Sequence, residues 1–180
     1  MPQYIFDLDL TLYSNNDFTE TDNEIEYYNS FKPKQKLGSI LKSIKGRKYI
    51  LTNANIAHVD EVLDKLKLKN IFDDMMSSDV ADSYKPESNI YHISNHVFNL
   101  EKYKSDESDP IYFFEDLSEN LKKGKQLYNW NTVLISPNKV KKTKYIDYVF
   151  DTIENAMLFF KQKESTKNRK VKKKLITKSV

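Results

Sequence analysis

Pairs of acidic residues follow two of the most apolar segments of the sequence. They are Asp7 and Asp9 after YIF, and Glu115 and Asp116 after IYFF. Because ionised carboxylates are costly to remove from water, acids that directly follow buried strands need a chemical reason to be there. Side chains two positions apart in an extended segment point to the same side. Asp7 and Asp9 are therefore expected to face a common partner.

Four carboxylates at close range repel one another unless a cation lies among them or a proton is shared. The sequence has no cysteine, which excludes a disulfide framework, a thiolate zinc site and a cysteine nucleophile. A donor set made only of oxygen atoms favours a hard cation. We therefore predict a site for Mg²⁺ at Asp7, Asp9, Glu115 and Asp116.

Polar residues of other kinds follow the next apolar run and precede a predicted helix. Thr52 and Asn53 come after YIL, and Lys85 forms a pair with Pro86, a residue well suited to the first turn of a helix. Ligands of parallel sheets bind beyond the carboxyl ends of the strands. We expect these side chains to lie near the four carboxylates.

Short apolar runs alternate with helical periodicity along residues 1–160, which is typical of βα units and a parallel sheet. The fold class that this pattern predicts is α/β, a three-layer α/β/α Rossmann-like sandwich. The expected strands are 4–6, 49–51, 75–77, 111–114, 132–135 and 148–150. The expected helices lie near 34–45, 56–66, 86–97, 117–128 and 152–161.

Four motifs, in this order, resemble those of the haloacid dehalogenase-like (HAD) superfamily, and within it the subfamily of pyrimidine 5′-nucleotidases and sugar-phosphate mutases. The motif DxDx[TV] matches DLDLT at residues 7–11, and a hydroxyl residue that ends an apolar strand matches Thr52. The lysine of a Lys-Pro pair matches Lys85, and an acidic pair that closes a strand matches Glu115 and Asp116. Each motif alone is short, but four in order at predicted strand ends are specific. The resemblance covers about residues 1–160.

The resemblance implies a phosphatase that acts on a phosphorylated small molecule or macromolecule, with a nucleotidase as one form. Asp7 would attack the phosphorus atom and form an aspartyl-phosphate. Asp9 would protonate the leaving oxygen and then activate water, and its like-charged neighbours are expected to raise the pKa of its carboxyl group. Thr52, Asn53 and Lys85 would bind the substrate phosphate, with Thr52 and Lys85 also counted as catalytic.

The resemblance also implies the cofactor. Mg²⁺ would be held by Asp7, Glu115 and Asp116, and by Asp9 through its backbone carbonyl. The ion would offset the charge of the phosphate and orient the attack. The acid/base at Asp9 argues against the dehalogenase branch, which is expected to lack one there.

The sequence departs from these relatives at two places. Leu10 stands where they usually carry Gly or Asn, and we expect it to alter the turn that leaves the strand. The relatives insert a helical cap between the first two motifs, but here only 43 positions separate Asp9 from Thr52. We predict a reduced cap at 14–33 and an open site. The identity of the substrate is not implied, because the cap is the part that selects it.

The charge of the chain is concentrated in its last twenty residues. Residues 161–180 hold nine basic residues and one acidic residue, a net charge of +8, whereas residues 1–160 carry −5. We expect a core domain at 1–160 and a basic, disordered tail at 161–180 that could contact nucleic acid through its phosphates. The alternative function is therefore a catalytically weak HAD-fold protein that binds nucleic acid or a protein partner through this tail.

Other features of the sequence limit its location and further sites. We identify no signal peptide and no apolar run long enough to cross a bilayer. We therefore expect no membrane partner and a cytoplasmic location, with the nucleus as the alternative because of the basic tail. His92 and His96 lie four residues apart but lack the glutamate of an HExxH motif, so we interpret them as surface residues.

Overall fold

The computed structural model describes residues 1–180 except 104–108, 139, 141–142 and 177–180, and along 167–176 it describes the backbone alone. Six parallel strands form one sheet in the order β3-β2-β1-β4-β5-β6. The strands are β1 (Gln3–Phe6), β2 (Arg47–Leu51), β3 (Asp74–Met76), β4 (Ile111–Glu115), β5 (Asn131–Ile135) and β6 (Tyr148–Phe150). The helices are α1 (Glu24–Asn29), α2 (Gln35–Ser43), α3 (Ile56–Lys65), α4 (Ser78–Ala81), α5 (Ser88–Val97), α6 (Ser118–Tyr128) and α7 (Ile153–Ile176). The α/β fold class is confirmed.

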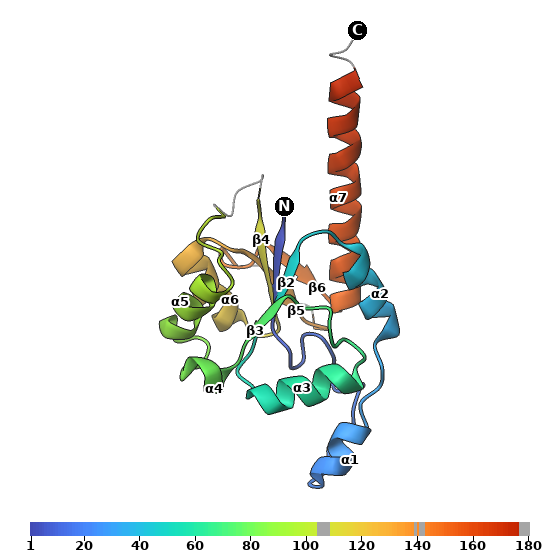
Figure 1. Cartoon of the computed structure of the whole chain (residues 1–180), viewed down its shortest axis with the longest axis vertical. Helices are drawn as coiled ribbons and strands as arrows, with labels where there is room; N and C mark the ends of the chain where they lie inside the picture. The colour runs from blue at the N-terminus through green and yellow to red at the C-terminus, as the bar shows by residue number, and fades with distance from the viewer. Residues whose placement is uncertain (104–108, 139, 141–142, 177–180) are drawn as a thin grey trace.

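Helices cover both faces of the sheet (Figure 1). Side chains of β1 alternate between the faces, so Tyr4 and Phe6 pack with α2, α3 and α7, whereas Ile5 packs with α5 and α6. Burial on both faces explains why the strands are continuous apolar runs rather than alternating ones. The result is the three-layer arrangement that the sequence predicts.

The register of the central strands brings their carboxyl ends to one edge. Phe6 of β1 lies opposite Ile50 of β2 and Phe114 of β4. The next residue of each strand segment is therefore at the same height, and the backbone N–H of Asp7 donates to the carbonyl of Phe114 at 2.9 Å. This register places the two acidic motifs side by side.

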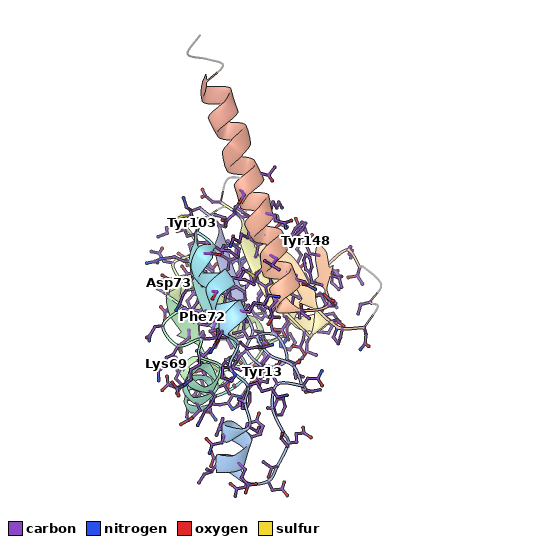
Figure 2. All side chains as sticks on the ribbon, turned by 90° about the vertical axis from the view of Figure 1, so that its right-hand side faces the viewer. Tyr13, Lys69, Phe72, Asp73, Tyr103 and Tyr148 are labelled. Atoms are coloured by element: carbon purple, nitrogen blue, oxygen red, sulfur yellow. The ribbon has the colours of Figure 1, made fainter. Side chains whose placement is uncertain are left out.

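Residues 14–33 are more ordered than a polar loop. They contain the short helix α1, which the sequence pattern did not predict and which begins at Asn23, whose side chain accepts hydrogen bonds from the first turn. Phe18 and Phe31 stack on each other, and the rings of Tyr27 and Tyr13 meet them mainly edge to face. Figure 1 shows α1 projecting beyond α3, on the side of the sheet where β1 ends, and Tyr13 lies on that side of the body (Figure 2).

The last helix differs from its prediction. We expected it to end near Lys161 and to be followed by a disordered tail, but α7 continues to Ile176. Its sequence has no glycine or proline, and its many Lys, Glu and Gln residues favour a helix. Glu164 accepts a hydrogen bond from Tyr4, and Lys163 donates to Tyr148, which lies beside the helix (Figure 2). Beyond these contacts α7 extends away from the body, and residues 177–180 lie outside the described residues (Figure 1).

None of the helices within the described residues combines the length and the apolar composition that crossing a lipid bilayer requires.

Candidate functional site

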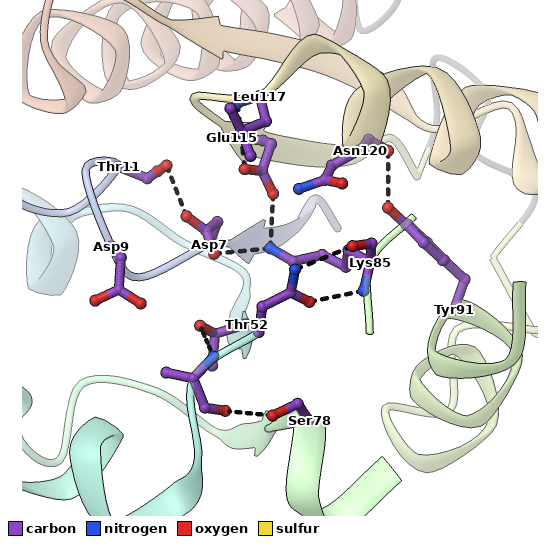
Figure 3. Close-up of polar contacts among 12 residues, drawn as sticks. Asp7, Asp9, Thr11, Thr52, Ser78, Lys85, Tyr91, Glu115, Leu117 and Asn120 are labelled. Atoms are coloured by element: carbon purple, nitrogen blue, oxygen red, sulfur yellow. Dashed lines mark hydrogen bonds and ion pairs between the residues drawn. The ribbon is translucent and has the colours of Figure 1, made fainter. Parts of the chain in front are cut away.

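A buried lysine joins the two acidic motifs at the carboxyl edge of the sheet (Figure 3). The Nζ atom of Lys85 lies 2.7 Å from Oδ1 of Asp7 and 2.6 Å from Oε2 of Glu115. The Lys85 and Glu115 side chains are each 1% exposed, and that of Asp7 is 7% exposed. Thr11 donates to Oδ2 of Asp7 at 3.0 Å. Both oxygens of Asp7 are therefore held in a fixed orientation.

The electrostatics of this group are unbalanced without a further cation. Burial, followed by the charge of Glu115, raises the pKa of Asp7 to about 7, although Lys85 lowers it in part. Burial also raises the pKa of Glu115 to about 7 and, mainly through the same cause, raises the pKa of Asp116. One ammonium group is thus too little positive charge for three neighbouring carboxylates.

These three carboxylates form the candidate metal site. Asp7, Glu115 and Asp116 each offer a carboxylate oxygen, and the three oxygens lie within 4.8 Å of one another. An all-oxygen donor set is the set that Mg²⁺ prefers, and a divalent cation would relieve the excess negative charge. The residues therefore fit the ion. The carboxylate of Asp9 is not part of this group.

Asp9 is held by a different set of partners. Its Oδ1 accepts a hydrogen bond from the hydroxyl of Tyr13 and lies 2.9 Å from Nε2 of His58. Burial opposes ionisation of Asp9, but the hydrogen bonds from His58 and Tyr13 outweigh it and lower the pKa of Asp9. The predicted direction was therefore wrong, because the nearest groups are hydrogen-bond donors rather than other carboxylates.

His58 is a site residue that the sequence analysis missed. It lies in the first turn of α3, where its backbone N–H donates to the N-cap residue Asn55 at 2.9 Å. Its Nδ1 lies 3.0 Å from the hydroxyl of Tyr28, which belongs to α1. One feature of the sequence could have identified His58 as a site residue. It stands six residues after Thr52, at the start of the helix that follows the second motif. The short insertion thus touches the site through Tyr28.

Thr52 and Asn53 lie where the sequence places them, but their side chains are already engaged. The Thr52 hydroxyl oxygen accepts from the backbone N–H of Ala54 at 3.1 Å. Oδ1 of Asn53 accepts from the backbone N–H of Lys85 at 2.6 Å, and its Nδ2 donates to the carbonyl of Lys85 at 3.0 Å. In this arrangement the Asn53 amide positions Lys85.

Leu10 lies in the turn that directly follows Asp7 and Asp9. Its backbone has a φ of 59°, in the left-handed region, and its side chain is exposed. Glycine and asparagine adopt this conformation more easily than leucine does. A leucine at this position is therefore unfavourable for the backbone of the turn.

An open hollow adjoins Asp9. Its volume is about 500 Å³, and its walls include Asp9, Tyr28, Asn53, His58, Asp79 and Tyr84. Asp7 and Glu115 are buried and do not line it. By contrast, His92 and His96 are exposed on α5, as predicted.

No family model matches the sequence, and a search of curated proteins finds no match. Solved structures do match. A HAD phosphatase from Thermococcus onnurineus is 14% identical with a TM-score of 0.66, and the match covers 89% of this chain and 98% of that one. An L-2-haloacid dehalogenase from Xanthobacter autotrophicus with chloropropionic acid covalently bound is 13% identical with a TM-score of 0.59, covering 79% and 68%.

A third structure is the putative HAD-hydrolase YfnB from Bacillus subtilis bound to magnesium. It is 18% identical with a TM-score of 0.54, and the match covers 69% of this chain and 53% of that one. The chain therefore spans about half the length of YfnB. At these identities the likeness shows a shared fold.

Proposed function

We propose that this chain, which has the fold of the haloacid dehalogenase-like superfamily, is an Mg²⁺-dependent phosphomonoester hydrolase that works through an aspartyl-phosphate. The observation that carries the proposal is the arrangement of Asp7. Its carboxylate is held by Lys85 and Thr11 within 4.8 Å of two further carboxylates, and Asp9 lies two residues away with its own hydrogen-bond partners. A fixed nucleophile beside an acid/base is what a two-step hydrolysis needs.

In the first step, an oxygen of Asp7 attacks the phosphorus atom and the bond to the leaving oxygen breaks. The leaving oxygen takes a proton from Asp9. Asp9 is ionised at rest, but an arriving phosphate dianion adds negative charge beside it and favours its protonation. The contacts with His58 and Tyr13 keep the carboxyl group oriented for this transfer.

In the second step, water attacks the phosphorus atom of the aspartyl-phosphate. Asp9, which gave up its proton in the first step, accepts one from this water, and the bond between phosphorus and Asp7 breaks to release inorganic phosphate. Lys85 stays paired with Asp7 and Glu115 and offsets their charge. Mg²⁺ held by Asp7, Glu115 and Asp116 would supply charge neutralisation for the phosphate.

The dehalogenase among the similar structures also suggests another reaction for a carboxylate nucleophile. Displacement of a halide needs no proton donor at the leaving group, because halide ions leave unprotonated. Here Asp9 stands beside the nucleophile with two hydrogen-bond partners and faces the open hollow. This placement favours a leaving oxygen, and hence a phosphate ester.

The test is hydrolysis of 4-nitrophenyl phosphate with Mg²⁺ and with EDTA. We expect activity in Mg²⁺, little activity in EDTA, and loss of activity in Asp7→Asn. This variant keeps the side-chain shape and removes one of the crowded negative charges, so it should fold. Asp60→Asn, an exposed aspartate on α3, is the matched control and should retain the wild-type rate. Equal rates in wild type and Asp7→Asn would contradict the proposal.

A further inference from the structure

We propose that the hollow beside Asp9 binds the leaving group of the substrate and selects leaving groups that carry no negative charge. This inference rests on the proposed function and specifies the class of substrate. Three observations support the inference: the position of the hollow, the charged residues in its walls, and the uncharged residues in the same walls.

The position of the hollow follows from Asp9. The leaving oxygen must lie within hydrogen-bond distance of the group that protonates it. Asp9 is that group and also forms part of the wall, whereas Asp7 and Glu115 are buried and do not line the hollow. The rest of the leaving group must therefore extend into the space in front of Asp9.

The charge of the walls is negative. Asp9 and Asp79 both line the hollow, and among the described residues around it none is a lysine or an arginine. Asp79 accepts hydrogen bonds from Ser77 at 2.6 Å and from the backbone of Ile56 at 3.0 Å, and these bonds lower the pKa of its exposed carboxyl group. Lys85, the lysine of the site, is buried against Asp7 and Glu115 and does not line the hollow. His58 also lines the hollow, but its Nε2 is already paired with Asp9 at 2.9 Å, so a second anionic group on the substrate would meet net repulsion here.

The uncharged parts of the walls suit a polar organic group. Tyr84 is 56% exposed and Tyr28 is half-buried, so both offer ring surface as well as a hydroxyl group. Asn53 and Asn55, which carry no charge, also line the hollow. A volume of about 500 Å³ is in the range of small-molecule sites, so the whole leaving group can be accommodated.

The test uses two substrates of the same shape, 4-carbamoylphenyl phosphate and 4-carboxyphenyl phosphate, which differ by one negative charge. For the wild-type protein at low ionic strength, we expect kcat/KM to be higher for the carbamoyl ester by about tenfold. Hydrolysis of both esters at equal rates would overturn this inference and leave the proposed function standing. Hydrolysis of neither would instead contradict the proposed function.

Two variants test whether the hollow is the source of the preference for the carbamoyl ester. Asp79→Asn removes the charge and keeps an oxygen that can accept from Ile56, so we expect the preference to fall to about a third of the wild-type value. Asp82→Asn, which removes an exposed charge just after α4 and outside the hollow, should keep the full preference. An unchanged preference in Asp79→Asn would overturn the assignment.

A second measurement needs no variant. Because exposed charges are screened by salt, the preference of the wild-type protein should shrink by about half or more when the ionic strength rises from about 0.02 M to about 0.5 M. A preference that does not depend on salt would mean that shape rather than charge selects the substrate, which would also overturn the inference.

Discussion

Nε2 of His58 lies 2.9 Å from Oδ1 of Asp9, and Nδ1 of the same ring lies 3.0 Å from the hydroxyl of Tyr28. The imidazole thus bridges the proposed acid/base and the segment 14–33, to which Tyr28 belongs. One ring connects three separate segments of the chain, and its removal should affect proton transfer more than binding.

The first prediction concerns this bridge. His58→Ala should lower kcat by about tenfold or more for an alkyl phosphate, because Asp9 loses an orienting partner for protonation of a poor leaving group. The effect should be smaller for 4-nitrophenyl phosphate, whose leaving group needs little protonation. KM should change less than kcat in both cases.

The matched control is His96→Ala, an exposed histidine on α5 whose side chain is 81% exposed. Steady-state rates of both variants on both esters test the prediction. A uniform loss on the two esters would indicate a structural role for His58 and contradict a role in proton transfer.

The second prediction concerns the buried lysine. Lys85→Met should lower the free energy of unfolding by about 3–5 kcal/mol, because it leaves two buried carboxylates without their cation. Lys125→Met removes a lysine of a more exposed pair with Asp147, at 2.7 Å, and should cost about 1 kcal/mol or less. Urea unfolding in EDTA measures the free energy of unfolding of both variants. An equal decrease in the two variants would show that the buried ion pairs of Lys85 stabilise the protein no more than the exposed pair of Lys125.

The third prediction concerns pH and Mg²⁺. The pKa values of Asp7 and Glu115 are raised to about 7 when the protein is folded, above their values of about 4 when it is unfolded. Between these values the folded state binds more protons, so the free energy of unfolding falls as the pH rises and stays low above the folded pKa values. A cation bound by these carboxylates should restore stability mainly at pH values above about 7, at which the carboxylates are ionised.

We therefore expect Mg²⁺ to raise Tm more at pH 8 than at pH 5.5, relative to EDTA at each pH. Thermal unfolding with the two additives measures this difference. In Asp7→Asn the difference should be smaller, since one of the ligands is lost. A gain in Tm that is the same at both pH values would contradict a site at these carboxylates.

The fourth prediction concerns Leu10. Its φ of 59° is unfavourable for a leucine, and its side chain is 42% exposed and belongs to neither buried core cluster. Leu10→Gly or Leu10→Asn should therefore stabilise the protein by about 1 kcal/mol and raise Tm. Val97→Asn, at a valine of similar exposure (45%) within α5, should give no such gain. A lower Tm in both Leu10 variants would show that the leucine side chain is needed.

The sequence predicts the position of those site residues that lie at the carboxyl ends of strands. Asp7, Thr52 and Glu115 follow apolar runs that can only be buried strands, and a parallel sheet brings such ends to one edge. Lys85 is predicted from its Lys-Pro pair, although the bridge to Asp7 and Glu115 is visible only in the structure.

What the sequence does not predict depends on packing between distant segments. The pKa of Asp9 is set by His58 and Tyr13, and neither contact follows from local spacing alone. Tyr28 reaches His58 because aromatic residues fold the insertion against α3. The extension of α7 does not follow from the sequence, because a run of basic residues is typical of disordered tails although each of them can also be helical.

The most direct measurement of the central claim is the covalent state of Asp7 during turnover. In Asp9→Asn, 4-nitrophenyl phosphate should still phosphorylate the protein, because 4-nitrophenolate leaves without a proton, but the base that activates water is gone. After an acid quench, mass spectrometry should find about one phosphate per chain, attached to Asp7 and absent from Asp7→Asn. A phosphate on another residue, or steady hydrolysis by the wild-type protein with no phosphate on Asp7, would contradict the account.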